Sequence, residues 1–280
     1  MKLVSWNTQW CCGLDGTVSP QRIVEGAGEM ADFDVLCLQE ISQGFQRLQG
    51  TPGDQPMQIA ALLPGFRCFF GAAVDEFQAD GTRQRFGNLI ATRLPVARVQ
   101  HHALPWPADA GVMSMPRMCT VVTVIHPALG SLRVMTTHLE YYSAPQRLAQ
   151  AQALHALHGE ACALAAAPPQ RSDDGSPFQT KVHTPHALLC GDFNADPRDP
   201  AVAAIIAAAG AHDFKDAWPL VHATAPHAPT FRLFDHSYGD EPMTYDFVFV
   251  SAGLASRVRR IEVDGTTQAS DHQPVMIELA

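Results

Sequence analysis

Residues 186–196, HALLCGDFNAD, join an apolar segment to two side chains that carry oxygen ligands. Asp192 and Asn194 stand two residues apart after the Leu-rich part of this stretch. Because side chains alternate along a strand, both residues project to the same side of the chain. A carboxylate and a carboxamide that converge in this way can hold a hard cation, or a phosphate beside one. Both residues are also common turn formers, so the rest of the chain must distinguish the two explanations.

Four other apolar segments are joined to the same kind of polar side chain. KLVSWN ends in Asn7, DVLCLQE ends in Glu40, RVMTTH ends in His138, and ASDHQ places Asp271 and His272 before a final apolar segment. Each residue alone has a structural explanation, such as a turn at Asn7 or a helix cap at Glu40. If all these strand ends lie on one edge, they form a cluster of acids, amides and imidazoles. Catalytic groups usually occupy such positions on a rigid scaffold.

Runs rich in Val, Leu, Ile and Phe, bounded by Gly, Pro, Asp or Asn, predict the strands that position these residues. The predicted strands are 2–6, 34–39, 67–70, 87–92, 119–126, 131–137, 186–190, 245–251, 257–263 and 274–279. Helices are predicted at 20–31, 145–167 and 199–209, the second with Ser143 as its N-cap and the third with Gly210 as its C-cap. Strands in mixed order with few intervening helices predict an α/β layered domain that contains two sheets.

Residues 168–186 are polar, rich in proline and without a periodic pattern. This stretch is long for a connection, which favours a surface loop and leaves a functional loop as the alternative. Together with it, the segments 42–58, 72–86, 101–117 and 222–243 are the loops in which substrate selectivity is expected.

The chain has 280 residues, of which 46% are hydrophobic and 17% are charged, a composition typical of a globular protein with a sizeable core. Its 19 Lys and Arg residues against 28 Asp and Glu residues give a formal net charge of −9. Such a surface repels long polyanions, so tight non-specific binding to nucleic acid is not expected. A local basic patch remains compatible with these totals.

The seven cysteines are an odd number and lie partly within apolar runs such as VLCLQ and LLCGD. This pattern predicts reduced, buried thiols rather than a disulfide framework, and the lack of a CxxC pair disfavours a thiolate zinc site. The first residues have the pattern of a core strand, which predicts no secretory signal. The longest apolar run, 201–211, is too short to cross a bilayer. We therefore expect a cytoplasmic protein without a membrane anchor.

The ordered motifs of the chain resemble those of the endonuclease/exonuclease/phosphatase superfamily, also called DNase I-like. The matching segments are SWN (5–7), LQE (38–40), GNLIATRLPV (87–96), TTHLE (136–140), GDFN (191–194), YDFVFVS (245–251) and SDH (270–272). One motif alone would be weak, but the set occurs in the order of the family and covers nearly the whole chain. The resemblance implies a four-layer α/β sandwich, with two mixed β-sheets packed face to face and helices outside. It also implies a single catalytic domain over residues 1–280.

The resemblance further implies a site for a divalent cation. Glu40 would bind the cation, Asn7 would help directly or through a water molecule, and Asp271 would hold a second ion. A site built only of oxygen ligands suits Mg²⁺ or Mn²⁺ rather than zinc.

Other matching positions are implied to act on the phosphate. His272 would be either the general base that activates water or the group that stabilises the phosphoryl charge. Asp246 would accept the other ring N–H of His272 and fix its tautomer. Asp192 and Asn194 would position the attacking water and the phosphate oxygens. His138 would face the leaving group as a hydrogen-bond donor or a general acid.

Several polar residues outside these motifs have two explanations each. Arg117 opens a strand and is the preferred phosphate contact among the arginines, because a guanidinium matches the geometry of a phosphate. Arg147 and Gln150 lie about one helical turn apart, so they either orient the loop after the HLE motif or form a plain surface pair. For His155 and His158, three residues apart on one helix face, the favoured explanation is a solvated face.

These residues together predict a phosphoesterase that cleaves a P–O bond by direct attack of water. Such hydrolysis needs charge neutralisation, an aligned water and help for the leaving oxygen. The expected substrate is a phosphodiester in a nucleic acid or in a smaller phosphorylated compound. The alternatives are a lipid or inositol phosphate phosphatase, including a sphingomyelinase-like enzyme, and an inactive binding module. The acidic balance and the lack of a basic amphipathic helix argue against membranes, and the complete set of polar groups argues against a mere binding module.

Two departures from the family argue against abasic DNA as the substrate. The abasic-site endonuclease branch has Tyr-x-x-Asn where this chain has MTTH (135–138), and it has an acid where this chain has Gln9. The THLE form is closer to the DNase I, sphingomyelinase-like and tyrosyl-DNA phosphodiesterase-like branches. The sequence matches none of these branches closely, and it leaves open the number of ions, the endo or exo mode and the oligomeric state.

Overall fold

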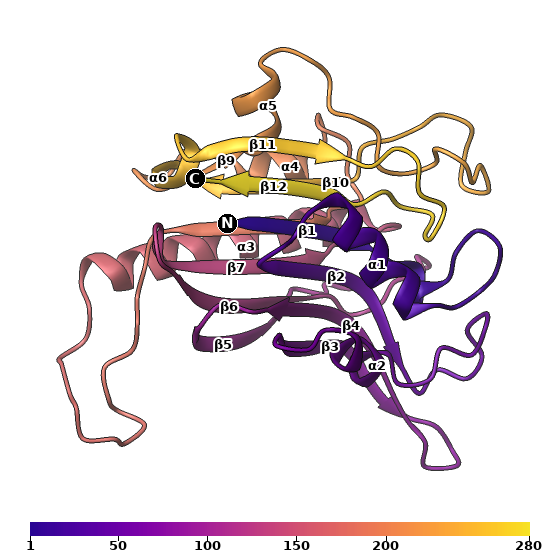
Figure 1. Cartoon of the computed structure of the whole chain (residues 1–280), viewed down its shortest axis with the longest axis horizontal. Helices are drawn as coiled ribbons and strands as arrows, with labels where there is room; N and C mark the ends of the chain where they lie inside the picture. Colours follow the sequence, from indigo (N-terminus) through magenta and orange to yellow (C-terminus); the bar gives the residue numbers. More distant parts are fainter.

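Two six-stranded mixed sheets form the centre of the molecule, in a computed structural model that describes all residues 1–280. In spatial order, the first sheet contains β11 (Val258–Val263), β12 (Val275–Leu279), β1 (Lys2–Asn7), β2 (Val35–Gln43), β4 (Arg83–Thr92) and β3 (Arg67–Phe77). The second contains β5 (Val96–Ala103), β6 (Met118–His126), β7 (Gly130–His138), β8 (Ala187–Asp192), β10 (Asp246–Ser251) and β9 (Phe214–Asp216). Because β1 pairs with β12, the two ends of the chain lie side by side (Figure 1).

Each sheet has one parallel pair at its centre, and these pairs carry several of the predicted polar residues. β1 runs parallel to β2, with Asn7 opposite Gln39, and β7 runs parallel to β8, with His138 opposite Asp192. All of β8, and all of β1 except its first residue, are buried. This burial on both faces explains why these segments are continuous apolar runs rather than alternating ones.

Helices cover the outer faces of both sheets. On the first sheet these are α1 (Pro20–Met30) and α2 (Gln55–Leu62), and on the second they are α3 (Ala144–Ala166) and α4 (Pro200–Ile205). The short helices α5 (Ala217–His222) and α6 (Ala252–Ala255) instead add residues to the core between the sheets, and a 3₁₀ helix, η1, lies at Gln9–Cys11. Ser143 is the N-cap of α3, as predicted, and its hydroxyl accepts the N–H of Gln146. Helices α1, α2, α3 and α4 each have a proline at their first or second position, where it fits because a first-turn N–H has no partner within the helix.

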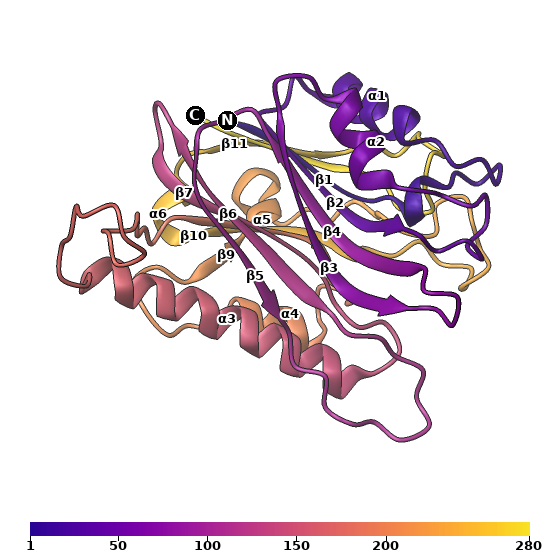
Figure 2. The same ribbon diagram turned by 90° about the horizontal axis from the view of Figure 1, so that it is seen from below.

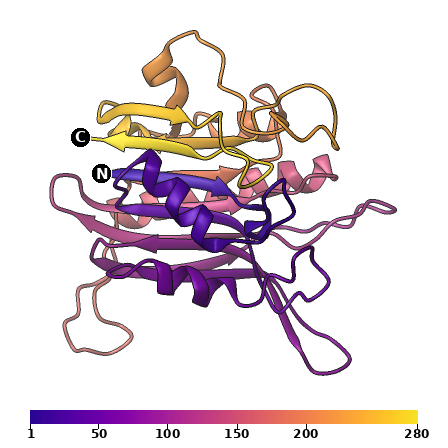
Figure 3. The same ribbon diagram turned by 45° about the vertical axis from the view of Figure 1, so that its right-hand side comes forward.

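Three hydrophobic cores hold four layers together. The core between the two sheets includes Leu3, Val35, Val134, Leu188 and Ile277. A second core lies between the outer face of the second sheet and α3 with α4, and a third lies between the outer face of the first sheet and α1 with α2. Figures 2 and 3 show these helices on the outside of the paired sheets. The predicted four-layer α/β sandwich is therefore confirmed.

One predicted helix is shorter than expected. Helix α4 ends at Ile205, so the predicted extension to residue 209 and the cap at Gly210 are wrong. The N–H of Ala209 bonds instead to the carboxylate of Asp213 at 2.9 Å. Residues 206–211 are exposed, so a longer helix would bury no apolar face there.

The sequence pattern also missed two strands. The edge strand β5 is only half buried and mixes polar with apolar residues, and β9 has three residues, so neither shows a clear period. Strands β3 and β4 form a longer hairpin than predicted, because their paired ends continue into exposed polar residues. The stretch 168–186 contains no helix or strand, as expected. None of the helices combines the length and the apolar character that crossing a bilayer requires.

Candidate active site

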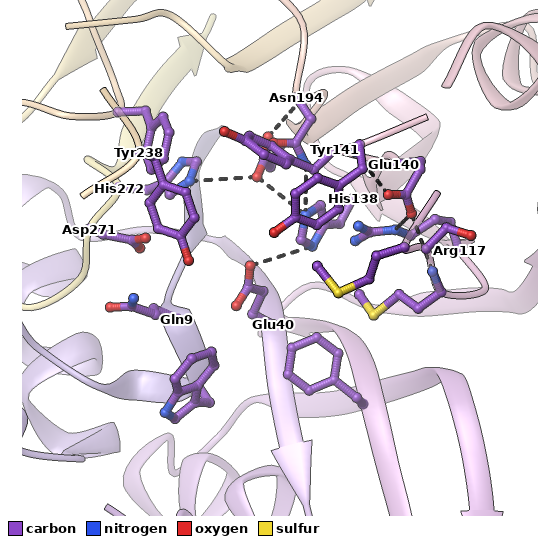
Figure 4. Close-up of a pocket in the computed structure, with 18 residues that line it drawn as sticks. Gln9, Glu40, Arg117, His138, Glu140, Tyr141, Asn194, Tyr238, Asp271 and His272 are labelled. Atoms are coloured by element: carbon purple, nitrogen blue, oxygen red, sulfur yellow. Dashed lines mark hydrogen bonds and ion pairs between the residues drawn. The ribbon is translucent and has the colours of Figure 1, made fainter. Parts of the chain in front are cut away.

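Side chains from both sheets meet at the edge where the central strands end (Figure 4). The amide nitrogen of Asn7 donates to Oδ2 of Asp192 at 2.9 Å and to Oε1 of Glu40 at 3.1 Å. Asn7 and Glu40 belong to the first sheet, and Asp192 belongs to the second. A single amide therefore links the two sheets at this point and holds two carboxylates close together.

Glu40 lies within β2 rather than at its end, because the strand continues to Gln43. A register shift between Leu38 and Ile41 marks a β-bulge, and Glu40 has a left-handed φ of 59°. Such a conformation is strained for an L-residue, and strain of this kind is common at functional sites. The side chain lines the cavity, where burial, followed by the charge of Asp271, raises the pKa of Glu40 to about 7.

Asp192, the last residue of β8, is buried and held by two donors. Its Oδ1 accepts the N–H of Asn194 at 2.8 Å, while Oδ2 accepts from Asn7. The preceding Gly191 has a φ of 139°, and a Cβ there would lie 1.9 Å from the carbonyl oxygen of Thr137. Glycine is therefore required for β7 and β8 to approach each other. Burial raises the pKa of Asp192 to about 6.

Asn194 holds His138 in one tautomer. The amide nitrogen of Asn194 donates to the carbonyl oxygen of Leu139 at 2.9 Å and lies 3.0 Å from Nε2 of His138. Because an amide nitrogen only donates, Nε2 accepts and the ring proton lies on Nδ1, which is 3.9 Å from Oε1 of Glu40. Burial, with the charge of Arg117 second, lowers the pKa of His138 well below its ordinary value. The ring is therefore neutral at pH 7.

His272 and Asp246 form a buried imidazole–carboxylate pair. Nδ1 of His272 donates to Oδ2 of Asp246 at 2.8 Å, and the ring of Phe231 stacks on the imidazole with centroids 4.4 Å apart. Burial alone would lower the pKa of His272, but the carboxylates of Asp246 and Asp192 outweigh it and raise the pKa to about 10. His272 is therefore an imidazolium at neutral pH, with its Nε2 3.7 Å from Oδ2 of Asp192.

Three carboxylates that line the cavity fit a hard cation. Glu40, Asp192 and Asp271 all have a raised pKa, mainly because of burial. This excess of buried negative charge is what a divalent cation would neutralise, and oxygen ligands suit Mg²⁺ or Mn²⁺. Ligand atoms of Asp192, Asp246 and His272 also lie within 4.8 Å of one another, but the imidazole of that group already bonds to a carboxylate and is protonated. The oxygen set is therefore the better fit.

Arg117 and Glu140 form a buried ion pair in the cavity wall. Nε of Arg117 donates to Oε2 of Glu140 at 3.2 Å, whereas Nη1 of the same guanidinium is buried without a partner. The side chain of Gln150 accepts the N–H of Glu140 at 2.9 Å, and Arg147 donates to the carbonyl oxygens of Glu140 and Tyr141. Arg147 and Gln150 thus orient the loop after the HLE motif rather than forming a surface pair.

The site opens into a cavity of about 390 Å³. Its apolar lining consists of Trp10, Phe86, Met113, Met115, Tyr141, Tyr142, Phe231 and Tyr238. Its charged lining consists of four carboxylates, from Glu40, Glu140, Asp192 and Asp271, and one arginine, Arg117, beside the two histidines. The cavity has the size and the mixed character typical of a site for one small molecule.

The aromatic lining was missed by sequence reasoning. Tyr141 contacts Tyr142 edge-on, with centroids 4.8 Å apart, and it also contacts Tyr238. Trp10 and Phe231 also line the cavity. The only signal was their position, since part of the lining lies in the loops 101–117 and 222–243 that were expected to select the substrate. No ligand spacing marks such residues, and only the folded chain brings them together.

Comparisons with known proteins agree with this geometry. A family model described as the Endonuclease/Exonuclease/phosphatase family matches residues 4–272. An endonuclease/exonuclease/phosphatase family protein from Bacteroides thetaiotaomicron has a similar structure, with a TM-score of 0.69 and 19% identity over 100% of this chain and 94% of that chain. An endonuclease/exonuclease/phosphatase from Beutenbergia cavernae has a TM-score of 0.67 and 22% identity, over 100% of this chain and 72% of that chain. The mannosyl-6-phosphatase Bt3783 of B. thetaiotaomicron has a TM-score of 0.67 and 19% identity, over 100% of this chain and 99% of that chain. No curated protein matches the sequence significantly.

Proposed function

Because this chain belongs to the endonuclease/exonuclease/phosphatase family, whose members hydrolyse phosphoester bonds, we propose that it cleaves a phosphodiester by direct attack of water. The observation that carries this proposal is the contact series Asp246–His272–Asp192 at one edge of the cavity. It combines a fixed imidazolium with a carboxylate whose pKa lies near neutrality. Residues 1–280 are proposed to act as one catalytic domain.

His272 is proposed to stabilise the phosphoryl charge rather than to act as the general base. An imidazole with a pKa of about 10 stays protonated at pH 7 and offers Nε2–H to a phosphoryl oxygen. Asp246 orients the ring, because its carboxylate accepts the other N–H.

Asp192 is proposed as the group that orients the attacking water and accepts its proton. Its pKa of about 6 leaves it mostly ionised at pH 7 and close to the value at which a general base is most effective. The N–H of Asn194 holds one carboxylate oxygen, and Asn7 holds the other, so the acceptor is fixed in place.

His138 is proposed to help the leaving group as a hydrogen-bond donor. The lowered pKa of the ring leaves little imidazolium at pH 7, which disfavours the alternative role of general acid. Asn194 fixes the tautomer that presents Nδ1–H on the side of Glu40. Arg117, whose Nη1 has no partner, is proposed to contact a phosphate oxygen.

Glu40 and Asp271 are proposed to hold Mg²⁺ or Mn²⁺, with Asp192 beside them. When bound, the cation would polarise the phosphoryl group and neutralise its charge. Asn7 is proposed to orient the carboxylates rather than to ligate, because its nitrogen contacts Glu40 and Asp192 while its oxygen accepts the N–H of Gln9.

The cavity favours a small phosphodiester with an aromatic or apolar group over a polyanion. A nucleic-acid strand or a multiply phosphorylated inositol needs several cationic contacts, and the lining provides one arginine against four carboxylates. Aromatic and methionine side chains instead offer contact area to a compact organic group. The cysteines are unpaired, most of them buried, which supports a reducing compartment, and we propose the cytoplasm.

A Mn²⁺-titrated assay with bis(4-nitrophenyl) phosphate tests the proposal. Wild type should show metal-dependent hydrolysis, and His272→Ala should lower kcat by about 10²–10³, the usual effect of losing one donor that stabilises transition-state charge. His227→Ala is the matched control, because His227 forms a similar 2.7 Å contact with Asp216 but does not line the cavity. Equal rates for wild type and His272→Ala at every Mn²⁺ concentration would rule out the proposed role.

A further inference from the structure

A second, smaller cavity of about 90 Å³ lies against the outer face of the second sheet. Its polar lining includes Arg98, Gln100 and His102 of β5, Thr123 of β6, Arg133 of β7 and His183 of the loop between α3 and β8. We call it the basic cavity. It shares no residue with the candidate active site, and nothing in the proposed hydrolysis uses it.

Arg133 is the central residue of the basic cavity, and none of its partners carries a negative charge. Its side chain is only 6% exposed. Nε donates to the carbonyl oxygen of Thr184, Nη1 contacts the sulfur of Met135, and Nη2 lies 2.6 Å from Nδ1 of His158. A guanidinium has more N–H donors than these three contacts use.

His158 does not neutralise Arg133. Its Nε2 donates to the carbonyl oxygen of His212 at 2.7 Å, so Nδ1 accepts from the guanidinium. Burial lowers the pKa of His158 to about 4, and the ring is neutral at pH 7. The sequence favoured a solvated face for this histidine, which is wrong: the ring is 3% exposed and stacks on Phe214.

The rest of the basic cavity holds one further arginine, Arg98, and one carboxylate, Glu160. Burial is the largest cause of the lowered pKa of His102; Arg98 and Arg133 also lower this pKa, and Glu160 opposes them. The one carboxylate in the lining belongs to Glu160, which is exposed. By contrast, the equally buried Arg117 of the active site pairs with Glu140. A buried guanidinium without a counter-charge is costly unless an anion compensates it.

We infer that the basic cavity binds one small tetrahedral oxyanion, inorganic phosphate or sulfate. Arg133 at the base and Arg98 at the rim would contact its oxygens, because guanidinium groups match such oxyanions. The volume is about three times the share of one water molecule in the liquid, which admits a single small anion and not a nucleotide. Val182 and His183, from the end of the loop 168–186, form part of the wall, so this loop would help to enclose the anion.

Calorimetric titration of the full chain with sodium phosphate, at constant ionic strength and without added divalent cation, tests this inference. Wild type should show one saturable site, and Arg98→Ala should weaken it by about tenfold, the loss that one charge-assisted hydrogen bond represents. Arg133→Met should abolish binding, with circular dichroism to check that the variant folds. If it does not fold, Arg98→Ala and His102→Ala decide the outcome.

Arg198→Met is the matched control, because Arg198 is exposed and lines neither cavity, so this variant should leave phosphate binding unchanged. Loss of binding in the active-site variant Arg117→Met but not in Arg98→Ala would overturn the inference, as would the absence of saturable heat in wild type. A parallel titration with glycerol 3-phosphate distinguishes a free anion from a phosphoryl group on a larger molecule. Binding of that ester but not of inorganic phosphate would also contradict the proposal.

Discussion

Strand β7 carries two buried polar residues that line cavities of opposite charge, Arg133 towards its start and His138 at its end. His138 lines a cavity with four carboxylates and one arginine, whereas Arg133 lines a cavity with two arginines and one exposed carboxylate. The first cavity has carboxylates with raised pKa values, which suit a cation, and the second has an uncompensated guanidinium, which suits an anion. One strand thus separates two sites whose unbalanced charges predict different ligands.

The largest expected difference between the two cavities is in catalysis. Asp192→Asn removes the proposed proton acceptor while keeping its size, and kcat should fall by about 10²–10⁴. Arg133→Met, in the basic cavity, should leave kcat within about twofold of wild type, since it lies outside the reacting groups. Steady-state rates on bis(4-nitrophenyl) phosphate in phosphate-free buffer measure both. Similar losses in the two variants would remove the functional distinction.

Next in size is the stability difference between the two buried arginines. Arg117→Met leaves Glu140 buried without its cation, and the free energy of unfolding should fall by about 3–5 kcal/mol. Arg133→Met leaves only neutral partners behind, so its loss should be about 1–3 kcal/mol, the cost of unsatisfied hydrogen-bonding groups. Urea denaturation of both variants gives the values. A larger loss for Arg133→Met would show that its charge is compensated in the folded chain.

Cation binding in the active-site cavity, called the acidic cavity below because Glu40, Asp192 and Asp271 line it, should strengthen as pH rises through 7. The pKa of Glu40 is raised from 4.5 to about 7, so the folded chain holds a proton that the cation must displace. Mn²⁺ affinity should therefore fall by about tenfold per pH unit below 7 and level off above it. The same shift stabilises the metal-free chain below pH 4.5, and that contribution is lost as pH rises through 7.

Mn²⁺ titrations by calorimetry at pH 5.5, 6.5 and 7.5 measure the first effect, and urea denaturation without metal measures the second. Glu40→Gln should flatten the stability profile between pH 4.5 and 7 and abolish high-affinity Mn²⁺ binding. An unchanged pH profile in this variant would assign the titration to another group.

The smallest expected effect concerns the aromatic lining. Tyr142→Ser should raise KM for an aryl phosphodiester by about three- to tenfold with kcat unchanged. The reason is that it removes an aromatic contact that stabilises the bound substrate and the transition state equally. Phe77→Ser is the control, since Phe77 is an exposed aromatic residue outside both cavities. Comparing bis(4-nitrophenyl) phosphate with methyl 4-nitrophenyl phosphate sharpens the test, as the preference for the second aryl group should shrink only in Tyr142→Ser.

The central strands and several groups of the candidate site were predictable because buried parallel strands are continuous apolar runs that end in polar side chains. Asp192 and His138 follow this rule directly. Glu40 was identified, but its setting was not, because a β-bulge with a left-handed residue leaves no apolar pattern. The half-buried edge strand β5 was missed for the same reason.

Contacts between distant segments were beyond the reach of sequence reasoning. The pairing of Arg117 with Glu140, the burial of His158 of α3 against Phe214, and the cavity that Arg133 shares with Arg98 all depend on tertiary packing. No local spacing distinguishes a buried guanidinium from a surface one. The basic cavity therefore emerges only from the folded chain.

The most direct test of the account is anomalous diffraction from crystals soaked in Mn²⁺. The account predicts a manganese peak in the acidic cavity at about 2.1–2.4 Å from a carboxylate oxygen of Glu40, and none in the basic cavity. Crystals soaked in saturating Mn²⁺ that show no peak beside Glu40 would contradict the proposed cation site. Manganese bound only elsewhere, in a protein that still hydrolyses the substrate, would contradict it as well.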